Sequence, residues 1–139
     1  MRVVIDTNVL LNCIGARTKH HKIWMAFLSE KISICTCSEI LLEYEELVFK
    51  RYPFNAAIQI FDILSDPDYV LQFEIYYCWN VITSDPDDNK FFDTSVAANA
   101  DYLITNDRHF NEVKRLNFPK VNIISADEFL QILDSLPDQ

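Results

Sequence analysis

Acidic residues follow several short apolar runs of this sequence, and these acids could together hold a divalent cation. The runs are rich in β-branched side chains and read as buried β strands; they cover residues 2–5, 80–83 and 102–105. The acids that come directly after them are Asp6, the segment Asp85-Pro86-Asp87-Asp88, and Asp107. Because parallel strands place their carboxyl ends at one edge of a sheet, we expect one acidic pocket there.

The chemistry of such a pocket follows from its charge. Like unit charges about 4 Å apart repel by roughly 4 kcal/mol at an effective dielectric constant near 20. The carboxyl groups therefore either stay partly protonated or hold a cation. Oxygen ligands favour Mg²⁺ or Mn²⁺ over zinc. The expected set of catalytic and metal-binding acids is Asp6, Glu43, Asp88 and Asp107.

A divalent ion at this place suits phosphodiester hydrolysis, because it lowers the pKa of a water molecule and stabilises charge on a phosphoryl group. No nucleophilic side chain is then needed. Asn8 and Thr105 are expected to orient a ligand or a carboxylate. Taken singly, Asp88 and Asp107 also fit as acids at helix starts, and Glu43 as a solvated helix residue. Asp6 has no such simple explanation.

Composition predicts one α/β domain over residues 1–139, with 50% hydrophobic and 24% charged residues. Gly15 is the only glycine, which argues against a glycine-rich phosphate loop. The net charge of −9 disfavours direct binding of nucleic acid, although bound cations would offset it, and it favours a basic protein partner. The four cysteines lack zinc-site spacing and are expected to be reduced core residues.

Strands and helices alternate along the chain, which predicts a three-layer α/β/α arrangement around a parallel sheet of four to five strands. The expected strands are 2–5, 32–36, 81–83, 103–104 and 121–124. The expected helices are a short one capped by Asn8, then 19–30, 38–51 capped by Ser38, 54–65, 88–99, 107–116, and a last one after a Ser125–Glu128 capping box. Residues 69–78 fit a short strand or an irregular arm.

Neither a signal peptide nor a long apolar run is visible, so we expect a cytoplasmic protein without a membrane segment.

Four segments of the chain, taken together, resemble the PIN domain. They are Ile5-Asp6-Thr7-Asn8-Val9-Leu10, Ser38-Glu39-Ile40-Leu41-Leu42-Glu43, Asp85-Pro86-Asp87-Asp88-Asn89-Lys90-Phe91 and Ala100-Asp101-Tyr102-Leu103-Ile104-Thr105-Asn106-Asp107. Their order and spacing match along nearly the whole chain, most closely in the prokaryotic branch of toxin–antitoxin toxins.

That resemblance implies a ribonuclease dependent on Mg²⁺ or Mn²⁺, inhibited by a cognate antitoxin protein and assembled as a homodimer. It places the family's acids on Asp6, Glu43, Asp88 and Asp107, with Asn8 and Thr105 in support. The run at 85–88 offers three acids where the family uses one, so Asp87 is the alternative to Asp88, and Asp93 is a further acid that could face the pocket.

Basic residues near the pocket are the expected RNA contacts. Lys90 and Arg108, with its neighbour His109, lie beside expected acids, whereas the run at 17–22 is further away and also fits a solvated face.

Three other functions were weighed against the nuclease. A haloacid-dehalogenase phosphatase needs a second Asp where Asn8 stands, and a response-regulator receiver needs a lysine where Ser125 stands. A non-catalytic PIN-like module that binds a protein partner remains the alternative.

Overall fold

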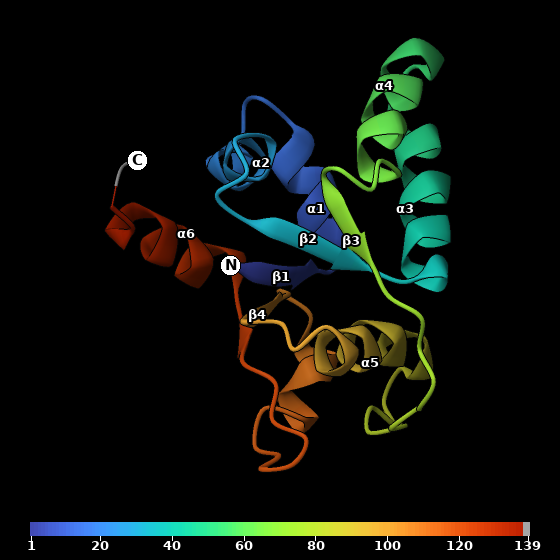
Figure 1. Cartoon of the computed structure of the whole chain (residues 1–139), viewed down its shortest axis with the longest axis vertical. Coiled ribbons are helices and arrows are strands. Elements are labelled where there is room, and N and C mark those ends of the chain that lie inside the picture. The colour runs from blue at the N-terminus through green and yellow to red at the C-terminus, as the bar shows by residue number, and fades with distance from the viewer. Residues whose placement is uncertain (138–139) are drawn as a thin grey trace.

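A five-stranded parallel sheet forms the centre of the protein. The computed structural model describes residues 1–137. The strands lie in the order β3-β2-β1-β4-β5 (Figure 1). Their bounds are β1 Arg2–Ile5, β2 Ser33–Thr36, β3 Val70–Gln72, β4 Tyr102–Ile104 and β5 Ile123–Ile124. The expected α/β class and the parallel sheet are thus confirmed.

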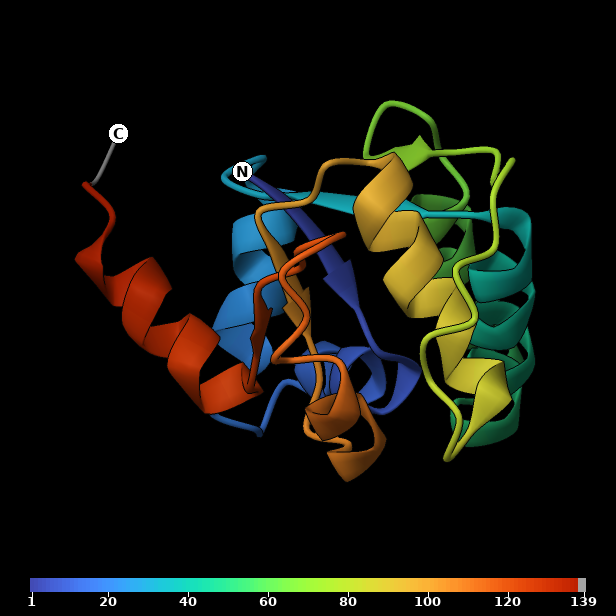
Figure 2. The same ribbon diagram turned by 90° about the horizontal axis from the view of Figure 1, so that it is seen from below.

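Helices cover both faces of the sheet, giving three layers (Figures 1 and 2). Helix α5 packs on one face, against β1, β2 and β4, while α1, α2 and α3 lie on the other, with α4 against α3 and α6 against α2. The helices are α1 Thr7–Ile14, α2 His21–Leu28, α3 Ser38–Arg51, α4 Phe54–Leu64, α5 Asn89–Ala97 and α6 Ala126–Ser135, and short 3-10 helices cover η1 Pro86–Asp88 and η2 Arg108–Glu112.

The central strand β1 is buried on both faces, as its run of β-branched residues predicts. Val3, Val4 and Ile5 have no exposed surface. Val3 pairs with Ile34 of β2 on one side and Tyr102 of β4 on the other. From β1 the chain passes first to β2 and later to β4, so the direction of winding reverses between β1 and β4. Ligands of open α/β sheets bind at such a reversal, beyond the carboxyl ends of the strands.

Several predicted elements agree with the structure to within a few residues, including the helices at 38–51 and 54–65. The capping box at Ser125 and Glu128 is present, with both of its hydrogen bonds. The two other predicted caps were wrong. Asn8 lies inside α1, whose N-cap position is Asp6, and α3 already begins at Ser38, after Cys37 at the N-cap position; neither side chain forms a capping hydrogen bond.

The prediction of a strand at 81–83 was also wrong. The third strand of the chain is β3, which lies in the segment 69–78. The backbone of Ile82 pairs with a side chain and not with a neighbouring strand. Its N–H donates to Asn89 Oδ1 at 2.9 Å, and its carbonyl accepts from Asn89 Nδ2 at 3.0 Å. Thr83 and Ser84 next donate their N–H groups to the Glu112 carboxylate. Side chains therefore satisfy the groups that a strand would have satisfied.

Asn89 fixes this irregular segment, so Asn89→Ala should loosen it. The substitution leaves the buried N–H and carbonyl of Ile82 without partners, which should lower the free energy of unfolding by roughly 2–3 kcal/mol. Chemical denaturation measures the loss, and hydrogen exchange should show faster exchange at Ile82 than in β1. Equal stability of the variant and the parent would contradict this role for Asn89.

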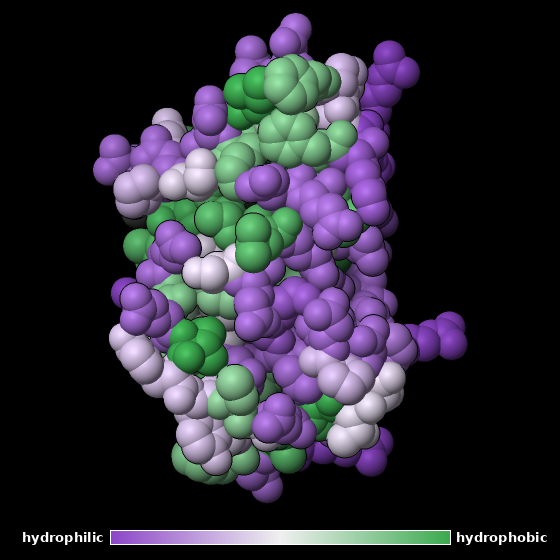
Figure 3. Space-filling view, turned by 90° about the vertical axis from the view of Figure 1, so that its right-hand side faces the viewer, coloured by the Kyte–Doolittle hydropathy of each residue, from purple (hydrophilic) through white to green (hydrophobic). Residues whose placement is uncertain are grey.

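Surface features complete the description. Cys13, Cys35 and Cys37 are buried and free as expected, but Cys78 is exposed, so it is not a core residue. Within residues 1–137, every helix is too short or too polar to cross a membrane. Figure 3 shows hydrophobic groups at the top of one side, where the hairpin of α3 and α4 lies; Phe54 is 68% exposed there.

Candidate functional site

Asp6 stands at the junction of β1 and α1, at the carboxyl end of the central strand. Its N–H donates to the Ile104 carbonyl at 3.0 Å, which extends the pairing of β1 with β4 by one residue. Its own carbonyl accepts the first helical hydrogen bond, from Leu10. The carboxylate does not cap the helix. The side chain is buried, with 6% of its surface exposed, and it is directed at the end of β4.

Thr105 links Asp6 to Asp107 across the reversal of the sheet. Its hydroxyl donates to Asp6 Oδ2 at 2.8 Å and accepts from the Asp107 N–H at 3.0 Å. The Asp107 carboxylate in turn accepts from the N–H of His109 and so caps η2. The expected supporting role of Thr105 therefore has a structural basis, because one hydroxyl sets the position of both acids.

Glu43 reaches the same region from the second turn of α3. One of its carboxylate oxygens accepts from the Thr7 hydroxyl, and the other lies 3.1 Å from Lys90 Nζ. Lys90 also contacts the Asp87 carboxylate at 3.0 Å, and only 7% of its side chain is exposed. Its ammonium group is therefore already held by two acids, which fits a role in holding Glu43 better than the expected contact with RNA.

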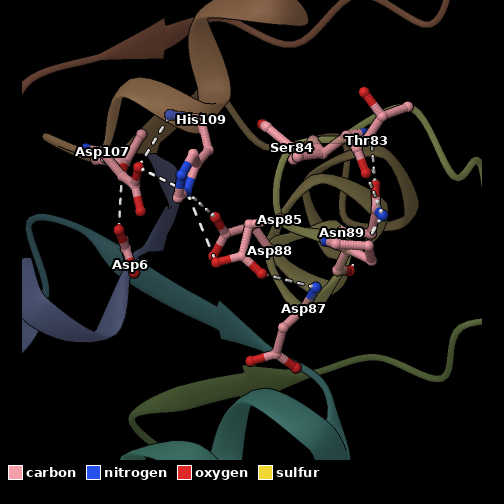
Figure 4. A network of polar contacts seen from close by, with 12 residues as sticks. Asp6, Thr83, Ser84, Asp85, Asp87, Asp88, Asn89, Asp107 and His109 are labelled. Carbon is pink, nitrogen blue, oxygen red and sulfur yellow. Dashed lines mark hydrogen bonds and ion pairs between the residues drawn. The ribbon is translucent and has the colours of Figure 1, made fainter.

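Asp88 approaches the site from η1, and His109 lies between it and Asp107 (Figure 4). The Nδ1 atom of His109 lies 3.0 Å from an oxygen of Asp107 and 3.3 Å from one of Asp88. It is also 3.6 Å from Asp85. Single ligand atoms of Asp85, Asp88 and His109 lie within 4.8 Å of one another, a spacing compatible with one shared metal ion.

The electrostatics of the site reflect crowding of negative charge. Burial raises the pKa of Asp6, Thr105 opposes this by hydrogen bonding, and the charges of Asp107 and Glu43 raise it further. Burial likewise raises the pKa of Asp88 to about 6, with added repulsion from Asp85, Asp107 and Asp6. The charges of Asp107 and Glu43 thus act on Asp6, and those of Asp107 and Asp6 act on Asp88.

The pKa of His109 is also raised, but the cause is attraction to the neighbouring acids. Partial burial lowers the pKa of its ring, but the charges of Asp107, Asp88 and Asp85 outweigh that effect and raise it. A cation is therefore favoured between these acids. The donor set, which is mostly carboxylate oxygen with one imidazole nitrogen, fits Mg²⁺ or Mn²⁺.

A cleft of about 340 Å³ opens beside Asp6 and Asp107. Asn8 and Asn12 of α1 line it together with Arg51 at the end of α3. Asn8 is exposed, so its amide is available to a ligand in this cleft. Arg51 was not foreseen as a site residue; its side chain arrives from a helix end 45 residues after Asp6, and no local pattern marks it.

The structure separates the alternatives at the remaining predicted positions. Asp88 joins the other acids, whereas the Asp87 side chain is 77% exposed and pairs with Lys90. Asp93 is buried elsewhere and accepts from the Trp79 N–H, so it is not a fifth member. Arg108 is exposed next to Asp107. The run at 17–22 ties α2 to α6, where Lys19 and Lys22 pair with acids.

Comparisons with known proteins agree with this arrangement. A chain of the VapBC2 complex from Rickettsia felis, crystallised on promoter DNA, superposes with a TM-score of 0.63 at 19% identity, covering 90% of this chain and 98% of that one. A chain of VapBC-1 from nontypeable Haemophilus influenzae superposes with a TM-score of 0.60 at 14% identity, covering 91% of this chain and 99% of that one. The PIN domain endonuclease Utp24 superposes with a TM-score of 0.55 at 18% identity, covering 89% of this chain and 84% of that one.

These identities are low, so the superpositions establish the fold alone. No curated protein sequence matches. The family assignment comes from the sequence itself, since the model of the PIN domain matches residues 2–109, which include all four acids and both supporting residues. The chain belongs to the PIN domain family.

Proposed function

We propose that this protein is a ribonuclease dependent on Mg²⁺ or Mn²⁺ that hydrolyses phosphodiester bonds. The observation that carries the proposal is the cluster of Asp85, Asp88 and His109, whose ligand atoms lie within 4.8 Å of one another. Asp107 contacts the same His109, and the charge of Asp107 acts on Asp6. Thr105 connects two of these acids through one hydroxyl. Burying several carboxylates together is unfavourable unless a cation compensates them, so a purely structural role explains the cluster poorly.

Each residue has a defined part in the proposed reaction. The acids Asp6, Asp88 and Asp107 would hold the ion, with Asp85 and His109 beside Asp88 as further ligands and Glu43 completing its surroundings. When bound, the ion supplies an activated water and charge stabilisation at the phosphoryl group. Thr105 orients Asp6, Lys90 holds Glu43, and Asn8 and Arg51 face the cleft where a phosphate would lie. Arg108 is placed to contact the RNA backbone.

We further propose that the protein is the toxin of a toxin–antitoxin pair in the cytoplasm. The structurally similar chains come from VapBC complexes and, at 14% identity, from FitAcB of Neisseria gonorrhoeae. The net charge of −9 favours a basic partner segment, as an antitoxin would need to offer. Homodimer formation is part of the same proposal.

Cleavage of RNA tests the enzymatic part. Purified protein is incubated with a labelled single-stranded RNA and, separately, with DNA of the same sequence, in Mn²⁺, Mg²⁺ or EDTA. We expect discrete RNA fragments with either metal and none in EDTA. Cleavage that persists in EDTA would refute metal dependence, and intact RNA under all conditions would favour the non-catalytic, partner-binding module.

Expression in bacterial cells tests the toxin part. Induction of the wild-type chain should arrest growth, and co-expression of the neighbouring small open reading frame should relieve the arrest. Normal growth of cells that contain active nuclease would separate the two parts, because it would contradict the toxin role while leaving the ribonuclease standing.

A further inference from the structure

We propose that an aromatic and basic surface next to the acidic site binds single-stranded RNA by base stacking. The surface consists of the rings of Tyr77, Trp79 and Phe118 together with the side chains of Lys114 and Lys120. This inference rests on the proposed ribonuclease function, because it names the form of RNA that reaches the site and the place where its bases are held.

The three rings form a continuous, exposed group. Tyr77 and Trp79 meet with their centroids 4.6 Å apart, and Trp79 and Phe118 meet at 5.8 Å, both nearly edge to face. Tyr77 is 64% exposed and Phe118 is 80% exposed. Large apolar rings with such a high exposed fraction indicate an interaction surface. Exposed ring faces are also what unpaired bases stack on, because every base has a flat π face.

Positive charge lies close to Phe118 in the sequence, although the chain as a whole is acidic and the charged residues beside Tyr77 and Trp79 are Glu74 and Asp93. Lys114, Arg115 and Lys120 flank Phe118 on one exposed segment, where Glu112 is the nearest acid in sequence. Among residues 1–137, the ion pairs involve none of these three cations. They can therefore neutralise phosphates without first breaking a contact inside the protein.

The surface is joined to the acidic site by the same two chain segments that carry it. One runs from Tyr77 through Trp79 to Asp85, and the other from Asp107 to Lys120; α5 lies between them in Figures 1 and 2. Glu112 fastens them together, accepting from Thr83 N at 2.6 Å and from Ser84 N at 3.1 Å. Trp79 and Asp85 are six positions apart, so even a fully extended chain places Trp79 within about 20 Å of Asp85.

These features favour single-stranded RNA over a protein partner. A protein-binding patch needs apolar surface, but it does not need three cations without ion pairs among residues 1–137 on the segment that carries Phe118. Duplex RNA is excluded by its own chemistry, because its bases are stacked on one another and cannot lie on side chains. The acidic site itself repels RNA until a cation is bound, so affinity must come from outside it. The aromatic and basic surface can supply that affinity.

Binding of a fluorescein-labelled 12-nucleotide oligo(U) tests the proposal. It is measured by anisotropy with the full chain in Ca²⁺, and the duplex of oligo(U) with oligo(A) serves for comparison. Tyr77→Ala and Phe118→Ala should each weaken oligo(U) binding about tenfold. Lys114→Ala and Lys120→Ala should each reduce the slope of log affinity against log salt by about 0.7. Phe54→Ala on α4 and Lys31→Ala are the matched controls and should change neither.

Tryptophan fluorescence gives a second measurement. Trp24 is buried, with 7% of its surface exposed, so quenching by oligo(U) reports on Trp79. Unchanged binding in both ring variants, or duplex bound as tightly as oligo(U), would overturn the stacking surface. If wild-type protein ignores oligo(U) but Phe118→Ala changes its mass in light scattering, the surface is a protein interface and the proposal is also wrong.

Cleavage assays keep this inference distinct from the ribonuclease proposal. Ring-dependent binding without any cleavage would retain the surface and reject the nuclease. Cleavage with KM unchanged in Tyr77→Ala and Phe118→Ala would retain the nuclease and reject the surface. If the ribonuclease proposal and the stacking surface are both correct, Tyr77→Ala and Phe118→Ala should raise KM and leave kcat within about twofold, because the rings do not contact the reacting phosphate.

Discussion

Asp6→Asn is expected to lower the rate of RNA cleavage by more than about a hundredfold while the protein stays folded. Asparagine keeps the size of the side chain but removes the negative charge that would hold a divalent ion. The backbone contacts of residue 6, with Ile104 and Leu10, do not involve the side chain and should persist. Replacing a buried carboxylate whose pKa is raised should also relieve repulsion from Asp107.

The measurement is single-turnover cleavage of a labelled RNA in saturating Mn²⁺, with circular dichroism as the check on folding. Asp62→Asn on the exposed side of α4 is the matched control and should cleave at the wild-type rate. Thr105→Val should fall between the two, about 10–100-fold below wild type, since it removes only the hydroxyl that positions Asp6. Equal rates of cleavage for Asp6→Asn and wild type would reject the proposed role of Asp6 in the site.

The sequence could predict that acids follow the strands of the sheet, because that placement depends on local pattern. β-branched runs predict strands, parallel strands share an edge, and Asp6 and Asp107 come directly after two neighbouring strands. Between the two alternatives, the Asp88 side chain is 13% exposed and lies near His109, whereas that of Asp87 is 77% exposed and pairs with Lys90. Glu43 was expected in the same set because it lies in the first turns of the helix after the second strand, and the resemblance to the PIN domain places one of the family's acids at the same position.

What the sequence missed depends on contacts between distant residues. The segment at 81–83 has the composition of a strand, yet Asn89 and Glu112 take its hydrogen bonds. The position of His109 among three acids follows from the path of η2, and that of Lys90 between Glu43 and Asp87 from the packing of α5 on α3. The contact of Trp79 with Phe118 joins residues 39 positions apart. Composition indicates none of these pairings.

The stability of the metal-free protein should rise as the pH falls from about 7 to 5, and Asp88 should account for much of the change. Its pKa is about 6 in the folded protein against 3.8 for an ordinary aspartate. A raised pKa means that the folded state holds the proton more tightly, so this contribution is present at low pH and is lost as the pH rises through about 6. Asp6 acts in the same direction.

Comparison with Asp88→Asn isolates this effect from other titrating groups. Glu112 and Asp127 have lowered pKa values, so their contributions to the stability of the folded protein are lost as the pH falls. In the wild type these losses partly offset the gain from Asp88. In EDTA at pH 7.5 the variant should be more stable than wild type by roughly 1–2 kcal/mol, because the full pKa shift is reduced by solvent at a partly exposed side chain. The difference should shrink as the pH falls below about 6 and disappear below about 3.8, where the carboxyl group is protonated in the folded and the unfolded protein alike.

Divalent metal should reverse the order of the two proteins. A ligand at a hundred times its Kd stabilises the folded state by about 2.7 kcal/mol, and wild type should gain this from Mg²⁺ or Mn²⁺ at pH 7.5. Asp88→Asn should gain much less, because it lacks one of the carboxylates that would hold the ion. Thermal melting in EDTA and in metal, with Asp62→Asn as control, measures both effects. The reversal distinguishes a metal site from a cluster neutralised by His109 alone, for which metal would leave the order unchanged.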